Sequence, residues 1–219
     1  MGGLTVQAVI FDADGTLFDT EHAMEQVWFS VCKEIGFLKP AEDYLDFIGL
    51  NRAALLSLMA EKYGTDFDAD SFMDRCAEGL HRRIETCGLP LKPGTRELLD
   101  CLYQKGIPMA LATSTHRIRT DRRLELSGLA KYFRITVTGN EVSHGKPHPE
   151  IYLTACEKLG FSPSACLAVE DSRNGILSAH AAGLSVVMIP DMIPPTPDLE
   201  EKLLYRFSSL TEVISLFSE

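Results

Sequence analysis

Short apolar runs without polar interruption recur along the chain, and helical periodicity follows most of them. We expect strands at residues 6–11, 107–112, 166–169 and 185–189, with a weaker strand at 135–138. Continuous rather than alternating apolar residues are typical of parallel strands that are covered on both faces. We expect helices between them, each followed by a glycine, at residues 95–105, 149–159 and 172–182. This alternation predicts an α/β fold with a doubly wound parallel sheet.

The pattern changes after the first strand, where helical periodicity continues for about 70 residues without a convincing strand. Helical periodicity covers residues 21–35, 51–63 and 69–86. Proline and glycine cluster directly after it, at residues 88–94, as they do in linkers. We therefore expect an inserted helical domain at residues 20–87, and a core domain formed by residues 1–19 and 88–219.

Composition narrows the class of protein. The chain has 219 residues, of which 45% are hydrophobic and 24% charged, an ordinary globular composition. Its formal net charge of -10 argues against a nucleic-acid partner, which usually needs a basic face. The six cysteines form no C-x-x-C pair, so we expect reduced thiols.

Targeting signals are missing from the sequence pattern. No apolar stretch approaches the roughly 20 residues that span a bilayer, and the first residues lack the basic-then-apolar order of a signal peptide. We expect a soluble, cytoplasmic protein with no membrane partner. The pattern leaves the oligomeric state open, a monomer included.

Polar side chains follow the predicted strands at the points where these end. They are Asp12 and Asp14 after the first strand, Thr113 and Ser114 after the second, Lys146 after the weaker strand, and Glu170 and Asp171 after the fourth. Residues two apart in an extended segment point the same way, so the first two carboxylates converge. Ligands of open parallel sheets bind beyond the carboxyl ends of the strands, so these groups are expected to share one rim.

Two of these carboxylates have clear tasks if the substrate is a phosphate monoester. Asp12 can attack phosphorus and form an aspartyl-phosphate, which divides one difficult displacement into two. Asp14 can then protonate the leaving oxygen and later activate water.

The remaining rim residues fit the charge of such a substrate. Mg²⁺ prefers hard oxygen ligands, which Asp12 and Asp171, with Glu170, can supply. Lys146 and the Thr113 hydroxyl can hold phosphate oxygens and offset the charge that develops in the transition state. The sequence therefore predicts a magnesium-dependent site for a phosphorylated metabolite.

Four motifs, in this order, resemble those of the haloacid dehalogenase superfamily, and of its phosphatase and phosphomutase branch. They are Asp12-Ala13-Asp14-Gly15-Thr16, Ala112-Thr113-Ser114, Gly145-Lys146-Pro147-His148-Pro149-Glu150 and Val169-Glu170-Asp171-Ser172. Residues 106–114 and 186–191 are similar to the β-phosphoglucomutase and pseudouridine-5'-phosphatase group. The resemblance implies a Rossmann-like core with the helical insertion as a mobile cap.

The resemblance also implies roles for single residues. Asp12 is the expected nucleophile and Asp14 the acid/base. Mg²⁺ is expected on Asp12, the Asp14 backbone carbonyl and Asp171. Arg52 follows a segment that resembles the family's substrate-specificity loop, so its multi-donor head is a candidate substrate contact. The alternative is a helix cap at Asn51 with an exposed arginine.

Basic residues follow the second strand. Ser114, His116 and Arg117 lie closest to the expected rim and are candidate substrate contacts, and most of the basic residues up to position 123 are expected to face water.

Three functions remain open. A phosphatase of sugar phosphates or nucleotide-like monoesters is favoured, and a β-phosphoglucomutase-type sugar phosphomutase is the alternative. Mutases of that group usually carry a histidine where this chain has Met24, which makes the phosphomutase hypothesis less favoured than the phosphatase hypothesis. The third is a non-catalytic sensor of a phosphorylated metabolite.

Overall fold

The computed structural model describes residues 6–48, 50 and 52–218. The chain divides into two compact units, the first made of Met1–Asp19 and Leu91–Glu219, the second of Thr20–Pro90. The second unit thus ends at Pro90 rather than at residue 87. Of the helices in the described residues, none has both the length and the apolar character that crossing a membrane requires. All six cysteines are free thiols.

The first unit contains a six-stranded parallel sheet in the order β3-β2-β1-β4-β5-β6. Its strands are β1 Ala8–Phe11, β2 Met109–Thr113, β3 Ile135–Thr138, β4 Cys166–Glu170, β5 Ser185–Met188 and β6 Tyr205–Arg206. The chain builds the sheet outward from β1 in one direction and then, from β4, in the other, so the topological switch point lies between β1 and β4. The predicted α/β, Rossmann-like doubly wound fold is confirmed.

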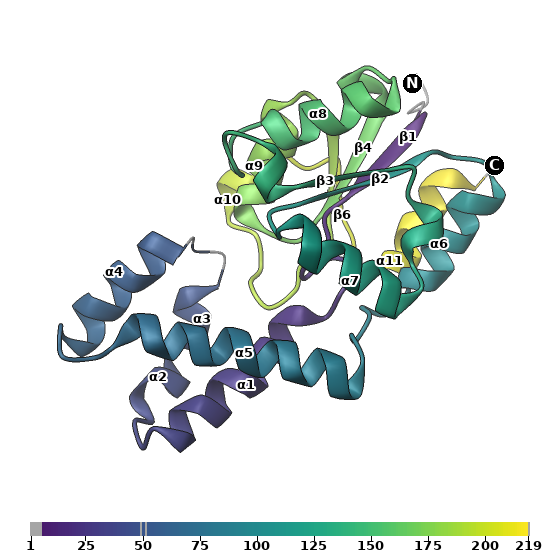
Figure 1. The fold of residues 1–219 in the computed structure, drawn as a ribbon. Coiled ribbons are helices and arrows are strands. Elements are labelled where there is room, and N and C mark those ends of the chain that lie inside the picture. The colour runs from purple at the N-terminus through teal and green to yellow at the C-terminus, as the bar shows by residue number, and fades with distance from the viewer. Residues whose placement is uncertain (1–5, 49, 51, 219) are drawn as a thin grey trace. The chain divides into compact units, whose positions relative to one another are not determined.

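Helices cover both faces of this sheet, with α8 and α9 on one face and α6, α7 and α11 on the other (Figure 1). The helices of this unit are α6 Thr95–Gln104, α7 Arg117–Ser127, α8 Glu150–Leu159, α9 Arg173–Ala181, α10 Pro197–Glu200 and α11 Leu210–Val213. Short 3-10 turns occur at Ala130–Tyr132, Gly139–Glu141, Pro163–Ala165 and Ile214–Phe217. Helix α7 was not expected, because its buried side is narrow and contains one apolar residue, Leu124, between Thr120 and Ser127.

Helix α8 packs on small side chains of the sheet. Ala110, Ala112 and Ala168 are buried in one apolar cluster with Ile151 and Tyr152 of α8. The small strand residues let the helix approach the sheet closely. Burial of a large side chain such as Ile151 stabilises the fold by roughly 1.5–3 kcal/mol. This packing carries the Tyr152 hydroxyl to the end of β4.

The second unit is entirely helical in its described residues. Its helices are α1 Thr20–Glu34, α2 Lys39–Glu42, α3 Tyr44–Phe47, α4 Arg52–Tyr63 and α5 Ala69–Cys87. Trp28 lies at its centre, with ring-centroid distances of 5.3 Å to Tyr44, 5.3 Å to Phe47 and 4.7 Å to Phe72. The Trp28 indole N–H donates to the carbonyl of Pro40 at 2.7 Å. The short helices α2 and α3 were not expected; α3 supplies Tyr44 and Phe47, α2 supplies the Pro40 carbonyl, and Phe72 comes from α5.

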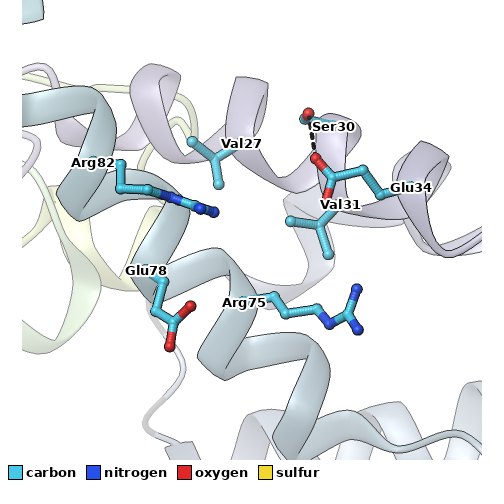
Figure 2. A pocket seen from close by; sticks show the side chains of 8 residues that line it. Val27, Ser30, Val31, Glu34, Arg75, Glu78 and Arg82 are labelled. Carbon is cyan, nitrogen blue, oxygen red and sulfur yellow. Dashed lines mark hydrogen bonds between the residues drawn. The ribbon is translucent and has the colours of Figure 1, made fainter. Parts of the chain in front are cut away.

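Helices α1 and α5 approach closely at Gly79. A Cβ atom placed on Gly79 would lie 2.6 Å from Val27 Cγ1, so a larger residue there would force the Val27 side chain or the helices to shift. Beside it lies a groove of about 460 Å³. Figure 2 shows its lining side chains, with Arg82 of α5 near Val27 of α1 and Arg75 of α5 near Val31 of α1.

Candidate active site

Asp12 stands at the end of the central strand. Its backbone N–H donates to the carbonyl of Val169 in β4 at 3.0 Å, which extends the pairing of β1 with β4 by one residue. The side chain is buried, since the residue is only 7% exposed. Asp12 therefore lies at the switch point of the sheet, where ligands of such folds bind.

Gly15 allows the loop after β1 to approach the end of β4. Its φ is +84°, in the left-handed region, and a Cβ atom there would lie 2.2 Å from Asp171 Oδ2. Thr16 Oγ1 donates to Asp171 Oδ1 at 2.9 Å. The loop after β1 is thus joined to Asp171 at the end of β4 by direct contacts across 155 residues of sequence.

Lys146 connects Asp12 with Glu170. Its Nζ lies 2.6 Å from Asp12 Oδ1 and 2.6 Å from Glu170 Oε1, and the Lys146 side chain is 4% exposed. Glu170 is completely buried and also accepts from the Tyr152 hydroxyl at 2.6 Å and the Ser172 hydroxyl at 3.2 Å. Both oxygens of Glu170 are therefore occupied by donors.

Three carboxylates converge at this point. Oxygens of Asp12, Glu170 and Asp171 lie within 4.8 Å of one another. The Lys146 ammonium supplies one positive charge to the first two. Excess negative charge on hard oxygen donors fits a divalent cation such as Mg²⁺.

Burial and charge perturb the acid–base behaviour of these groups. Burial raises the pKa of Asp12 from 3.8 to about 8, and the nearby Glu170 carboxylate adds to this, although the Lys146 ammonium opposes it. Burial alone would lower the pKa of Lys146, but Asp12 and Glu170 together raise it. The pKa of Tyr152 is raised well above its usual value by burial and by Glu170. Lys146 therefore keeps its positive charge, and burial shifts the pKa of the Asp12 carboxyl toward neutral pH.

Asp14 has two partners that the sequence pattern did not indicate. Thr115 Oγ1 donates to Asp14 Oδ2 at 2.7 Å, and the Arg123 guanidinium donates to Asp14 Oδ1. The Arg123 side chain is 12% exposed, in contrast to the expectation that most basic residues here face water. Together with Thr120, Leu124 and Ser127 it forms an i, i+3, i+4, i+7 stripe on α7, and recognition of that helix would have revealed it.

Three other candidate site residues lie at the end of β2 and directly after it: Thr113 is buried, whereas Ser114 and His116 are exposed. Thr113 is 1% exposed, and its Oγ1 accepts from the backbone N–H of Thr115 at 3.1 Å. Ser114 is exposed, and its carbonyl lies against Gly139, where a Cβ atom would approach it to 2.2 Å. His116 is exposed at the start of α7.

Arg117 is directed to a structural partner. Its guanidinium pairs with Glu141 and donates to the carbonyl of Thr136 at 2.6 Å, and its backbone N–H donates to Asn140 Oδ1 at 2.9 Å. Glu141 is already fixed by a capping box with Thr138. Arg117 therefore connects α7 with β3 and the residues that follow it, and its predicted contact with a substrate stays a prediction.

Arg52 lies within the helical unit. Its guanidinium forms ion pairs with Asp70 at 2.7 Å and Asp74 at 2.9 Å, and its side chain is 52% exposed. The alternative helix cap at Asn51, and Gly49 of the same segment, lie outside the described residues.

Comparison with known proteins identifies the family of the chain. The family model described as haloacid dehalogenase-like hydrolase matches residues 9–189. A phosphorylated carbohydrates phosphatase of Thermotoga maritima is 34% identical over 179 residues, which cover 82% of each chain. Hexitol phosphatase A of Escherichia coli is 36% identical over 194 residues, covering 88% of this chain and 86% of the relative.

The solved structures include similar folds. A crystal structure of a HAD family hydrolase from Deinococcus radiodurans, with bound phosphate and sodium, matches with a TM-score of 0.81 and 28% identity. The match covers 98% of this chain and 96% of that one. Fold and site thus define a doubly wound α/β protein with a cluster of carboxylates at the switch point of its sheet. The chain belongs to the haloacid dehalogenase-like hydrolase family, and within it to the phosphatases.

Proposed function

We propose that this protein hydrolyses phosphate monoesters of small metabolites, sugar phosphates or nucleotide-like esters, through an aspartyl-phosphate on Asp12 and with Mg²⁺. The observation that carries the proposal is the position of Asp12, buried at the switch point with the Lys146 ammonium 2.6 Å away. The relatives named phosphorylated carbohydrates phosphatase and hexitol phosphatase A support a phosphorylated carbohydrate or polyol as substrate.

Asp12, Asp171 and the backbone carbonyl of Asp14 are the proposed Mg²⁺ ligands. When bound, the cation supplies positive charge that lets an anionic nucleophile approach an anionic substrate. Glu170 was also a predicted ligand, but its oxygens are taken by Lys146, Tyr152 and Ser172. We therefore assign Glu170 to holding the Lys146 ammonium in place.

The reaction divides into two displacements at phosphorus. In the first, an Asp12 oxygen forms a bond to phosphorus, the bond to the leaving oxygen breaks, and Asp14 donates a proton to that oxygen. In the second, Asp14 accepts a proton from water as the water oxygen bonds to phosphorus, which releases inorganic phosphate and restores Asp12. Lys146 and the Thr113 hydroxyl hold phosphate oxygens in both steps. Arg123 and Thr115 hold the Asp14 carboxylate in position.

We propose that the helical unit is a cap that closes over the site and contributes Arg52 to substrate binding. Ser114 and His116 are the corresponding candidates on the first unit. Arg52 would have to share its guanidinium between the substrate and its partners Asp70 and Asp74. Its substitution should then reduce kcat/KM for the true substrate and leave a small generic ester unaffected.

Phosphate release from a panel of sugar phosphates, polyol phosphates and nucleotides tests the proposal, with Mg²⁺ and with a chelator. Asp12→Asn should abolish release, whereas the exposed control Asp66→Asn should not. Normal turnover by folded Asp12→Asn would overturn the covalent mechanism. Conversion of β-glucose 1-phosphate to glucose 6-phosphate without phosphate release would favour the mutase, and binding without turnover the sensor.

A further inference from the structure

A second group of metal-ligating side chains lies on the loop between β3 and α8 and at the first residue of α8. His144, His148 and Glu150 each offer one ligand atom, and these atoms lie within 4.8 Å of one another. The two histidines are exposed and the carboxylate is half-buried. This group shares no residue with the carboxylates at the end of β1.

The spacing of the ligand atoms suits a small tetrahedral ion. Glu150 Oε2 lies 2.9 Å from His144 Nδ1 and 3.9 Å from His148 Nδ1, and the two imidazole centroids are 4.6 Å apart. Bonds of about 2.0–2.2 Å from Zn²⁺ to nitrogen and oxygen place neighbouring tetrahedral ligand atoms about 3.3 Å apart. The observed distances lie on either side of this value, so small rotations of the rings complete the set.

The loop is already arranged around Glu150. Its carboxylate accepts from the backbone N–H groups of Ser143 at 2.7 Å and His144 at 3.0 Å. The Glu150 N–H donates to His148 Nδ1 at 3.3 Å, so this imidazole presents a lone pair toward Glu150. A metal would replace that long hydrogen bond and the contact between His144 and the carboxylate.

We propose that His144, His148 and Glu150 bind a divalent transition metal of the zinc class, with water in the remaining position. Two imidazoles and one carboxylate suit Zn²⁺, Ni²⁺ or Cu²⁺, whereas Mg²⁺ prefers the all-oxygen set at Asp12 and Asp171. The two sites thus select different ions by the chemistry of their donors.

Metal binding here would restrain the loop that carries Lys146. Lys146 lies between the two histidines in sequence, and the N–H of His148 donates to the Gly145 carbonyl at 3.0 Å. A metal joins residues 144, 148 and 150, so amide exchange of this loop should slow when Zn²⁺ binds.

Calorimetric titration of the chelator-treated, full-length protein with Zn²⁺ in excess Mg²⁺ tests the site. We expect a 1:1 site whose affinity falls by about tenfold or more in His144→Ala and in His148→Ala. His81→Ala and His180→Ala, both exposed, are the matched controls and should bind as the parent does. Asp171→Asn, which alters the carboxylate site, should also retain zinc binding.

Hydrogen exchange adds a readout on the folded protein. Zn²⁺ should slow exchange in a peptide covering residues 143–150 of the parent and not of His148→Ala. Unchanged zinc affinity in both histidine variants, loss of the site in Asp171→Asn, or displacement of Zn²⁺ by Mg²⁺ would each overturn the proposal.

Discussion

Replacement of Lys146 by methionine removes one ammonium from between two buried carboxylates. Methionine has a similar length, so the change removes charge and leaves little cavity. Asp12, whose pKa is already raised to about 8, loses the attraction that lowers its pKa, so its carboxyl stays protonated at pH 7. The cost then falls on Glu170, which is completely buried and keeps only neutral donors such as Tyr152.

The structure sets the size of this effect. With an effective dielectric constant of about 20, each ion contact at 2.6 Å is worth roughly 6 kcal/mol before desolvation is counted. Desolvation offsets much of this, and loss of one partner from a buried ion pair typically destabilises a protein by about 3–5 kcal/mol. We therefore expect Lys146→Met to lower the free energy of unfolding of the metal-free protein by about 3–5 kcal/mol.

Urea unfolding at pH 7, followed by circular dichroism, measures this free energy. The exposed control Lys105→Met should change it by less than about 0.5 kcal/mol. Adding Glu170→Gln to Lys146→Met should restore part of the loss, because the amide removes the uncompensated charge. A loss below about 1 kcal/mol, or no recovery in the double variant, would refute the reasoning.

Three further predictions concern other parts of the molecule. Arg123→Gln should lower kcat by about tenfold with little change in KM, because it releases the proposed acid/base carboxylate, and equal loss in the exposed control Arg119→Gln would contradict this. Gly79→Ala should lower the melting temperature, since a Cβ atom 2.6 Å from Val27 Cγ1 costs about 1–3 kcal/mol against a helix-propensity gain of about 1 kcal/mol. In a Val27→Ala background the same substitution should stabilise. Mg²⁺ must displace the proton of Asp12 below its pKa of about 8, so calorimetric Mg²⁺ affinity should rise between about pH 6 and 8 and then level off; a flat profile there would contradict the ligand assignment.

The buried strands of the sheet could be predicted from the sequence, because strands covered on both faces consist of continuous apolar residues. β1, β2 and β4 overlap the expected runs closely. β6 was missed because it is two exposed residues, Tyr205–Arg206, held beside β5 by backbone pairing. Helix α7 was missed because only Leu124 marks its buried side as apolar.

Some contacts of the candidate site could likewise be predicted from the sequence, and others could not. Asp12, Lys146 and Glu170 could be grouped in advance, since carboxyl ends of neighbouring parallel strands meet at one edge. The partnership of Asp14 with Arg123 spans 109 residues, and the stripe on α7 that indicates the buried position of Arg123 could be used only once that helix was recognised. The direction of Arg117 likewise depends on where Glu141 is held.

Trapping of the covalent intermediate tests the central claim most directly. The enzyme is quenched in acid during turnover of its best substrate, and its intact mass and peptides are then measured. The account predicts one added phosphoryl group, located on Asp12, and none in Asp12→Asn. A phosphoryl group on another residue, or an Asp12→Asn protein that still forms the phosphoenzyme, would contradict it.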